Sequence, residues 1–192
     1  QDAQSSIQKG HLITARAIYK YARNKMPPRT TVWMQSAEME RQHGTLQVLD
    51  KLLEEACQKL PQVEVFWLLR AKEQWQTGHN VDLAREILSQ AFQQNPSSQD
   101  VWLAAVKLEW ETGETERARV LLQRAIQQAP NARVYMKAAM LERHANATGP
   151  ALEFLTQGAR KYPKFAKFYM MAGQIYSDTG MWAKARQWFQ QG

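Results

Sequence analysis

The sequence predicts an all-α fold, a right-handed α-solenoid of tandem antiparallel helix pairs, because several residue types recur with one period near 34 residues. Proline recurs in steps of 34, 35, 34 and 33 residues, at Pro27, Pro61, Pro96, Pro130 and Pro163. An aromatic residue keeps the same period, at Trp33, Trp67, Trp102, Tyr135 and Tyr169. A self-similar period of this length is typical of stacked helical hairpins.

Small residues recur in the same register. One follows each aromatic residue by four positions, in the series Ala37, Ala71, Val106, Ala139 and Gly173. Glycine recurs as Gly10, Gly44, Gly78, Gly113 and Gly180. Alanine or glycine recurs as Ala22, Ala56, Ala91, Ala125, Ala159 and Gly192. We expect this last series on the second helix of each repeat, where a missing side chain lets two helices approach closely.

These series divide residues 1–192 into one array of four whole repeats and two partial ones. The boundaries are approximately 1–28 (partial), 29–62, 63–97, 98–131, 132–164 and 165–192 (partial). Neither end carries the polar outer face that a terminal repeat of a solenoid needs. We therefore expect the chain to be an excerpt of a longer array.

Each repeat is expected to contain a first helix, a short turn, a second helix and a turn marked by proline. The first helix is clearest in Val101–Trp110, whose apolar residues follow the 3.6-residue period of a half-buried helix. Gly113 supplies a left-handed residue that ends it. The second helix runs through Thr115–Ile126, and Pro130 closes it because proline cannot continue the backbone hydrogen bonds.

The fifth repeat departs from this plan between its two helices. Residues 144–150 replace the short turn and predict a longer loop on one face of the array. Pro150 lies where the first turn of a helix accepts proline. Longer turns of this kind often contact partners.

Composition favours a globular protein, with 44% hydrophobic residues in 192. The one cysteine, Cys57, excludes a disulfide framework, and we expect it to be a small packed hydrophobe within a helix. No apolar run approaches the roughly 20 residues that a membrane-spanning helix needs, so no membrane partner is expected.

The sequence gives no support to catalysis. The histidines form no pair at the spacing of metal ligands on a helix, and they are His11, His43, His79 and His144. The glycines of the series stand alone, so no phosphate-binding loop is indicated. We expect neither an enzyme nor a cofactor, metal or small-molecule substrate.

Net charge is the remaining functional signal. A charge of +7 and an isoelectric point of about 9.6 permit contact with RNA or with acidic protein segments. Lysine plus arginine minus acidic residues gives +4 for 1–28, −1 for each of the next three repeats, +4 for 132–164 and +2 for 165–192. The densest basic group consists of Arg133, Lys137, Arg160, Lys161, Lys164 and Lys167. It is a candidate contact for RNA or an acidic partner, and a solvated basic rim is the alternative.

Comparison of the repeats with one another predicts ion pairs between them. Arginine on a second helix precedes glutamate on the next first helix by 23 or 24 residues, in the pairs Arg16–Glu40, Arg85–Glu109 and Arg119–Glu142. Where the arginine is absent the glutamate is absent too, since Asp50 precedes Gln74 and Glu153 precedes Tyr176. A partly buried carboxylate between packed helices needs such a partner. We expect these pairs to fix the register of the helices.

The pattern of tryptophan, small residue, alanine and proline could be a tetratricopeptide repeat, but glutamate occupies the position where that family favours an aromatic residue. Ala-Arg pairs on the second helix, best seen in Thr14–Ala22, resemble the half-a-tetratricopeptide (HAT) repeats of RNA-processing factors. Further segments are similar to a spliceosomal scaffold of that family, namely Val101–Glu109, Ala132–Lys137 and Met170–Ile175.

The resemblance implies a nuclear protein-interaction scaffold of the pre-mRNA splicing machinery. Its partners would be other spliceosomal proteins of the U4/U6.U5 tri-snRNP, and direct contact with snRNA stays open. A second class of function is a direct RNA-binding module that uses the basic ends of the array. A steep fall of affinity for RNA with salt would favour the second class.

Overall fold

The computed structural model describes residues 2–8 and 10–192. Within these residues the chain forms twelve α-helices and no strand, so the predicted all-α class is confirmed. The chain divides into two compact units, Gln1–Asn95 and Pro96–Gly192, and each is described by itself. That all six repeats form one continuous array therefore stays a prediction.

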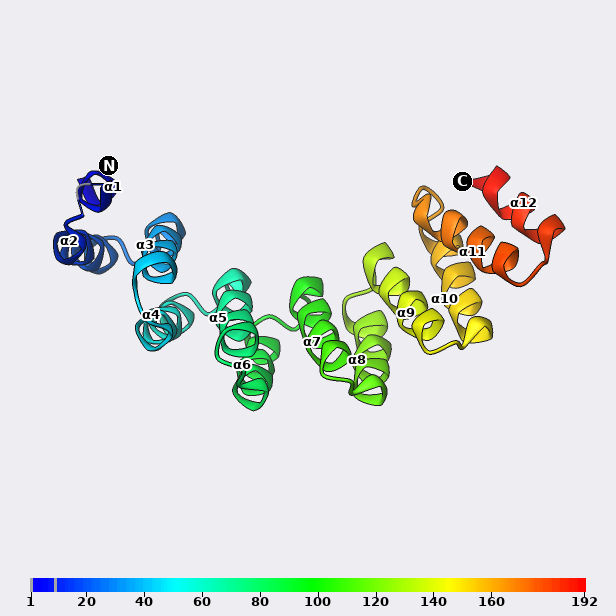
Figure 1. The fold of residues 1–192 in the computed structure, drawn as a ribbon, viewed down its shortest axis with the longest axis horizontal. Helices are drawn as coiled ribbons and strands as arrows, with labels where there is room; N and C mark the ends of the chain where they lie inside the picture. The colour runs from blue at the N-terminus through cyan, green and yellow to red at the C-terminus, as the bar shows by residue number, and fades with distance from the viewer. Residues whose placement is uncertain (1, 9) are drawn as a thin grey trace. The chain divides into compact units, whose positions relative to one another are not determined.

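The first unit contains three antiparallel helix pairs joined by short turns (Figure 1). Its helices are α1 (Asp2–Gln8), α2 (Leu12–Lys25), α3 (Thr30–His43), α4 (Leu46–Lys59), α5 (Glu64–Gln76) and α6 (Val81–Gln94). Each pair falls within one predicted repeat. The second helix of a pair packs on the first helix of the next, α2 on α3 and α4 on α5.

The second unit repeats this arrangement. Its helices are α7 (Gln99–Glu111), α8 (Thr115–Gln128), α9 (Ala132–His144), α10 (Thr148–Lys161), α11 (Lys167–Asp178) and α12 (Trp182–Gln191). Helix α8 packs on α9, and α10 packs on α11. Buried side chains from α9, α10 and α11 form a continuous apolar core around Tyr135, Leu155 and Phe168.

The aromatic and proline series are joined by hydrogen bonds. The indole Nε1 of Trp33 donates to the carbonyl of Pro27 at 2.9 Å, and Trp67 and Trp102 bond Pro61 and Pro96 in the same way. All five aromatic residues of the series are buried. A buried indole needs a hydrogen-bond acceptor, and the residue that cannot donate in the turn supplies one.

The alanine series is displaced by one residue in the fifth repeat. The amide that follows each of five second helices donates to a carbonyl in the series Ala22, Ala56, Ala91, Ala125 and Gly158. Gly158, and not the predicted Ala159, therefore occupies this position. A Cβ on Gly158 would lie 2.6 Å from the ring of Phe168, so this contact requires glycine.

The turns between paired helices follow the prediction in one repeat and differ from it in another. Gly113 has φ +83°, the left-handed conformation expected of it. The longer loop predicted at residues 144–150 is wrong, because α9 continues to His144 and α10 begins at Thr148. Asn146 takes the left-handed conformation with φ +58°, since its short polar side chain tolerates it, and Pro150 lies in the first turn of α10.

Candidate interaction surface and repeat junctions

The junction between α2 and α3 is closed by Arg16 and Glu40. Arg16 Nε and Nη2 donate to the two carboxylate oxygens of Glu40, each at 2.9 Å. The Glu40 side chain is only 7% exposed, whereas Arg16 is 42% exposed. The hydrogen bond and charge of Glu40 raise the pKa of Arg16 above its usual value. The structure thus brings together the first pair that the comparison of repeats singles out.

The junction between α8 and α9 has the same geometry. Arg119 Nε and Nη2 donate to the carboxylate of Glu142 at 2.8 and 2.9 Å. Arg119 Nη1 also donates to Glu116, one turn earlier on α8. Hydrogen bonding to Glu142 raises the pKa of Arg119 against the opposing effect of burial. Two-pronged bonds of this kind fix orientation as well as distance, so they hold successive repeats in register.

The third predicted pair, Arg85–Glu109, would join the two compact units. Arg85 belongs to the first unit, where it donates to Asp82 at 3.0 Å, and Glu109 belongs to the second. The pair therefore stays a prediction. Its test is that removing Arg85 alone should destabilise the chain more than replacing both residues with apolar ones of similar size.

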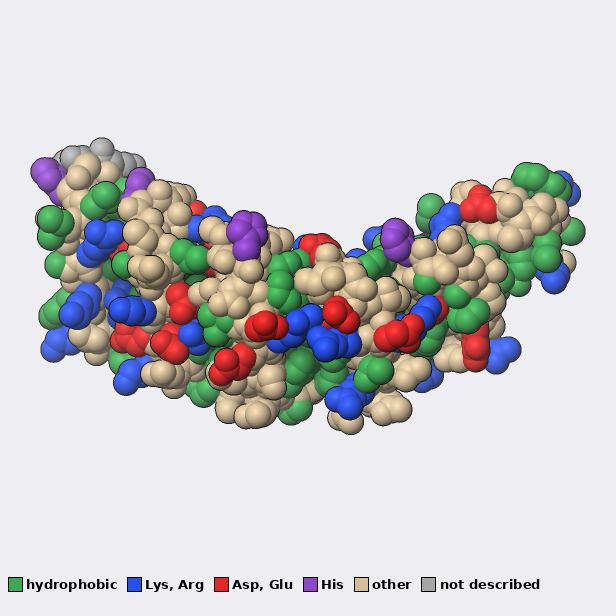
Figure 2. Space-filling view, turned by 60° about the horizontal axis from the view of Figure 1, so that its bottom comes forward, with side chains coloured by type: hydrophobic (Ala, Val, Ile, Leu, Met, Phe, Trp, Pro, Cys, Tyr) green, Lys and Arg blue, Asp and Glu red, His purple; other side chains and the backbone are tan. Residues whose placement is uncertain are grey.

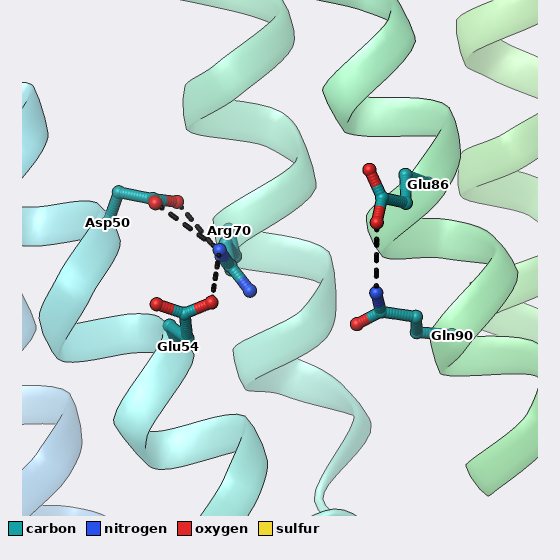
Figure 3. A network of polar contacts seen from close by, with 5 residues as sticks. All are labelled: Asp50, Glu54, Arg70, Glu86 and Gln90. Atoms are coloured by element: carbon teal, nitrogen blue, oxygen red, sulfur yellow. Dashed lines mark hydrogen bonds and ion pairs between the residues drawn. The ribbon is translucent and has the colours of Figure 1, made fainter.

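The junction between α4 and α5 carries an ion-pair network that the sequence comparison missed (Figure 3). Arg70 on α5 donates to both oxygens of Asp50, at 2.9 and 3.3 Å, and to Glu54 at 3.0 Å. Its side chain is only 9% exposed. Burial works to raise the pKa of Asp50, but hydrogen bonds from Arg70 and Gln74 and the charge of Arg70 lower it overall.

Asp50 therefore does not mark a lost pair, as its position opposite Gln74 suggested. The acid and the base have exchanged helices, and the arginine comes from one turn before Gln74 on α5. An arginine that departs from the surrounding repeats, at a position occupied by Ala105 and Ala138 in the second unit, was the available signal.

Cys57 lies on α4 beside this network and is 2% exposed. Burial raises the pKa of its thiol to about 12, although the nearby charge of Arg70 opposes the change. The thiolate that would act as a nucleophile is therefore scarce at neutral pH. Its place in the core agrees with the expected packing role.

The predicted basic group separates into engaged and exposed side chains. Arg133 donates to Asp100 at 2.8 Å, and Lys161 donates to the Tyr135 hydroxyl at 2.8 Å. The bond to Tyr135 raises the pKa of Lys161. The remaining members are exposed, and they are Lys137, Arg160, Lys164 and Lys167. On the face shown in Figure 2, basic and acidic side chains are interspersed on both units.

Three cavities open between helices within the units. One of about 430 Å³ lies among α1, α2 and α3, and another of about 400 Å³ among α7, α9 and α11. A third, of about 280 Å³, lies among α2, α3 and α4 and has a charged lining. In residues 2–8 and 10–192, no three His, Cys, Asp or Glu side chains gather as metal ligands. Every helix in the described part of the chain is too short or too polar to cross a membrane.

Comparison with known proteins supports a tetratricopeptide-type architecture. A family model described as a tetratricopeptide repeat matches residues 78–141. The crystal structure of MamA is 19% identical, covers 81% of this chain and 91% of its own, and has a TM-score of 0.60.

Two further solved structures agree. A tetratricopeptide repeat protein from Parabacteroides merdae is 17% identical over 97% of this chain and 74% of its own, with a TM-score of 0.58. PilF from Pseudomonas aeruginosa is 17% identical over 84% and 73%, with a TM-score of 0.61. At these identities the likeness shows a shared fold of tandem helix pairs, and the predicted solenoid class is confirmed.

Proposed function

We propose that this chain is a protein-interaction scaffold whose stacked helices present extended surfaces to partner proteins. The observation that carries the proposal is the use of its buried charges: Glu40, Asp50 and Glu142 are each bound by an arginine across a repeat junction. These ionisable groups serve the register of the helices. Repeat arrays of the tetratricopeptide type use surfaces held in register to bind proteins.

The setting we propose is the pre-mRNA splicing machinery in the nucleus. Its support is the resemblance of Val101–Glu109, Ala132–Lys137 and Met170–Ile175 to pre-mRNA-processing factor 6, a scaffold that bridges components of the U4/U6.U5 tri-snRNP. The partners would then be other tri-snRNP proteins, bound without a cofactor or small-molecule substrate.

Direct RNA binding is the second candidate function, and exposed cations near the end of α10 favour it. Arg160, Lys164 and Lys167 are exposed, and among the described residues no ion pair joins them to a carboxylate. If they contact phosphates, the logarithm of RNA affinity should fall steeply and linearly with the logarithm of salt concentration. Weak RNA binding with no sequence preference favours the scaffold.

Crosslinking mass spectrometry on the assembled tri-snRNP tests the scaffold directly. We expect crosslinks from several repeats to neighbouring proteins, and no crosslink to any of them would refute the proposed setting. Charge reversal of Arg160, Lys164 and Lys167 tests the basic group and spares Lys161, which supports Tyr135. A matched control reverses three exposed arginines elsewhere in the second unit, Arg117, Arg124 and Arg186. If both triple variants bind tri-snRNP proteins and RNA alike, the basic group is a solvated rim.

A further inference from the structure

Two successive second helices in the first unit carry opposite charge at equivalent positions. Helix α2 has Arg16, Lys20 and Arg23, and α4 has Asp50, Glu54 and Cys57, each 34 residues later. The acidic pair of α4 is matched by Arg70 from the following helix. The basic residues of α2 should likewise need an acidic counterpart.

The following helix supplies only part of that counterpart. Both carboxylate oxygens of Glu40 are bound by Arg16. At the position equivalent to Arg70, helix α3 has Ser36, a neutral residue. Arg23 Nη1 donates to the Ser36 hydroxyl and so obtains an uncharged acceptor. Neither Lys20 nor Arg23 forms an ion pair with a carboxylate among the described residues.

Arg23 is an unusual residue for its position. The equivalent positions of four later second helices are apolar, namely Cys57, Phe92, Ile126 and Ala159. Its guanidinium carbon lies 5.3 Å from the centre of the buried Trp33 ring, and its Nε is buried with no hydrogen-bond acceptor in the described chain. Burial lowers the pKa of Arg23, and the charges of Glu55 and Glu40 oppose this only in part. A residue that breaks the local rule of its repeat at a cost in stability indicates a functional site.

The cavity of about 280 Å³ lies directly beside Arg23. Four cations line it, Arg16, Lys20, Arg23 and Lys51, against two carboxylates, Glu40 and Glu55. The lining therefore has two more positive than negative charges, in a recess between three helices. Partial enclosure strengthens the attraction of such a recess for an anion.

We propose that this cavity binds an oxyanion group on a partner protein, either a side-chain carboxylate or the phosphoryl group of a phosphorylated residue. The bound group would supply at α2 the negative charge that Asp50 and Glu54 supply at α4. Glu40 and Glu55 in the lining disfavour the continuous backbone of RNA, and the Trp33 ring, 2% exposed, is not available to stack a base. The inference rests on the proposed function as an interaction scaffold and names one docking point of it.

The first test titrates the chain with inorganic phosphate at constant ionic strength and follows the arginine Nε–H signals by ¹⁵N NMR. We expect a saturable shift of the Arg23 signal. Lys59→Gln, which removes an exposed cation of α4 outside the cavity, should leave the curve unchanged. No saturable change of Arg23, or an equal change at all exposed arginines, would overturn the proposal.

Variants then separate binding from folding. Arg23→Ile places the residue of α8 at this position, so we expect an equal or higher melting temperature together with loss of saturable phosphate binding. Unchanged phosphate binding in Arg23→Ile would refute the site. Should that variant not fold, Lys20→Gln with Lys51→Gln changes only exposed side chains and should weaken phosphate binding by about tenfold. Wild-type affinity in the double variant counts against the proposal.

A last comparison identifies the source of the anion. A short peptide with one phosphoserine and its glutamate analogue compete against phosphate, beside a single-stranded RNA of equal length. We expect a peptide to displace phosphate at the lower concentration, and displacement by RNA at the lower concentration would overturn a protein partner. The phosphate titration reports on the cavity alone, whereas crosslinking in the tri-snRNP reports on the scaffold, so the two proposals fail separately.

Discussion

Between α2 and α3 the arginine comes from the second helix of one repeat and the carboxylate from the first helix of the next, whereas between α4 and α5 the two have exchanged sides. The helix packing is alike at both junctions. The Arg16–Glu40 pair is largely open to water on its arginine side, and the Arg70 network is buried on its arginine side. The comparison teaches that the repeat specifies a charged contact at this place without specifying which helix carries which sign.

The largest expected effect comes from the tryptophan that lies under the second junction. Trp67→Ala removes a large buried side chain and its bond to Pro61, and should cost about 3–5 kcal/mol of unfolding free energy. Urea denaturation followed by circular dichroism measures the change. A melting temperature like that of the wild type would contradict the packing described here.

The next effect separates the two junctions. Arg70→Leu leaves Asp50 and Glu54 without their shared partner and should cost about 2–3 kcal/mol, below the range for a fully buried pair because the Glu54 side chain is 46% exposed. Arg70→Leu combined with Asp50→Leu should cost less than Arg70→Leu alone. The reverse order in urea denaturation would show that the network contributes more than its own desolvation.

A smaller effect is expected at the first junction. Arg16→Gln leaves Glu40 with a neutral donor and should cost about 1–2 kcal/mol, because Arg16 is partly in water while Glu40 is not. Glu40→Gln is the matched change on the other side. If both variants unfold like the wild type in urea, the pair contributes specificity of register and no stability.

The smallest effect is the pH dependence at the second junction. The folded pKa of Asp50 is lowered, so its contribution is present above the unfolded pKa of about 4 and is lost as pH falls through the folded pKa. We expect about 0.5–1 kcal/mol of unfolding free energy to disappear on acidification in the wild type and not in Asp50→Asn. Urea titrations at pH 7 and pH 3 compare the two chains, and equal losses would exclude Asp50 as the source.

The fold was predictable because its signals are local and repeat. One period in proline, aromatic and small residues predicts helix pairs, and the same alignment matches Arg16 with Glu40 and Arg119 with Glu142. The network of Arg70 was not predicted, because a comparison of fixed positions misses a long side chain that reaches its partners from one helical turn away. Gly158 was misplaced since the period there shortens by one residue, which only the backbone hydrogen bonds reveal.

The bond from tryptophan to the proline six residues earlier sets where the chain can change its length. The three turns that precede a tryptophan-bearing helix each contain four residues, 26–29, 60–63 and 95–98. The turns before Tyr135 and Tyr169 contain three and five, and the turns within helix pairs contain from two to four. An insertion at 60–63 would draw the Trp67 indole away from its acceptor and out of the core at once. Turns without this indole bond can absorb a residue by rearranging backbone alone, so insertions and deletions should be tolerated there first.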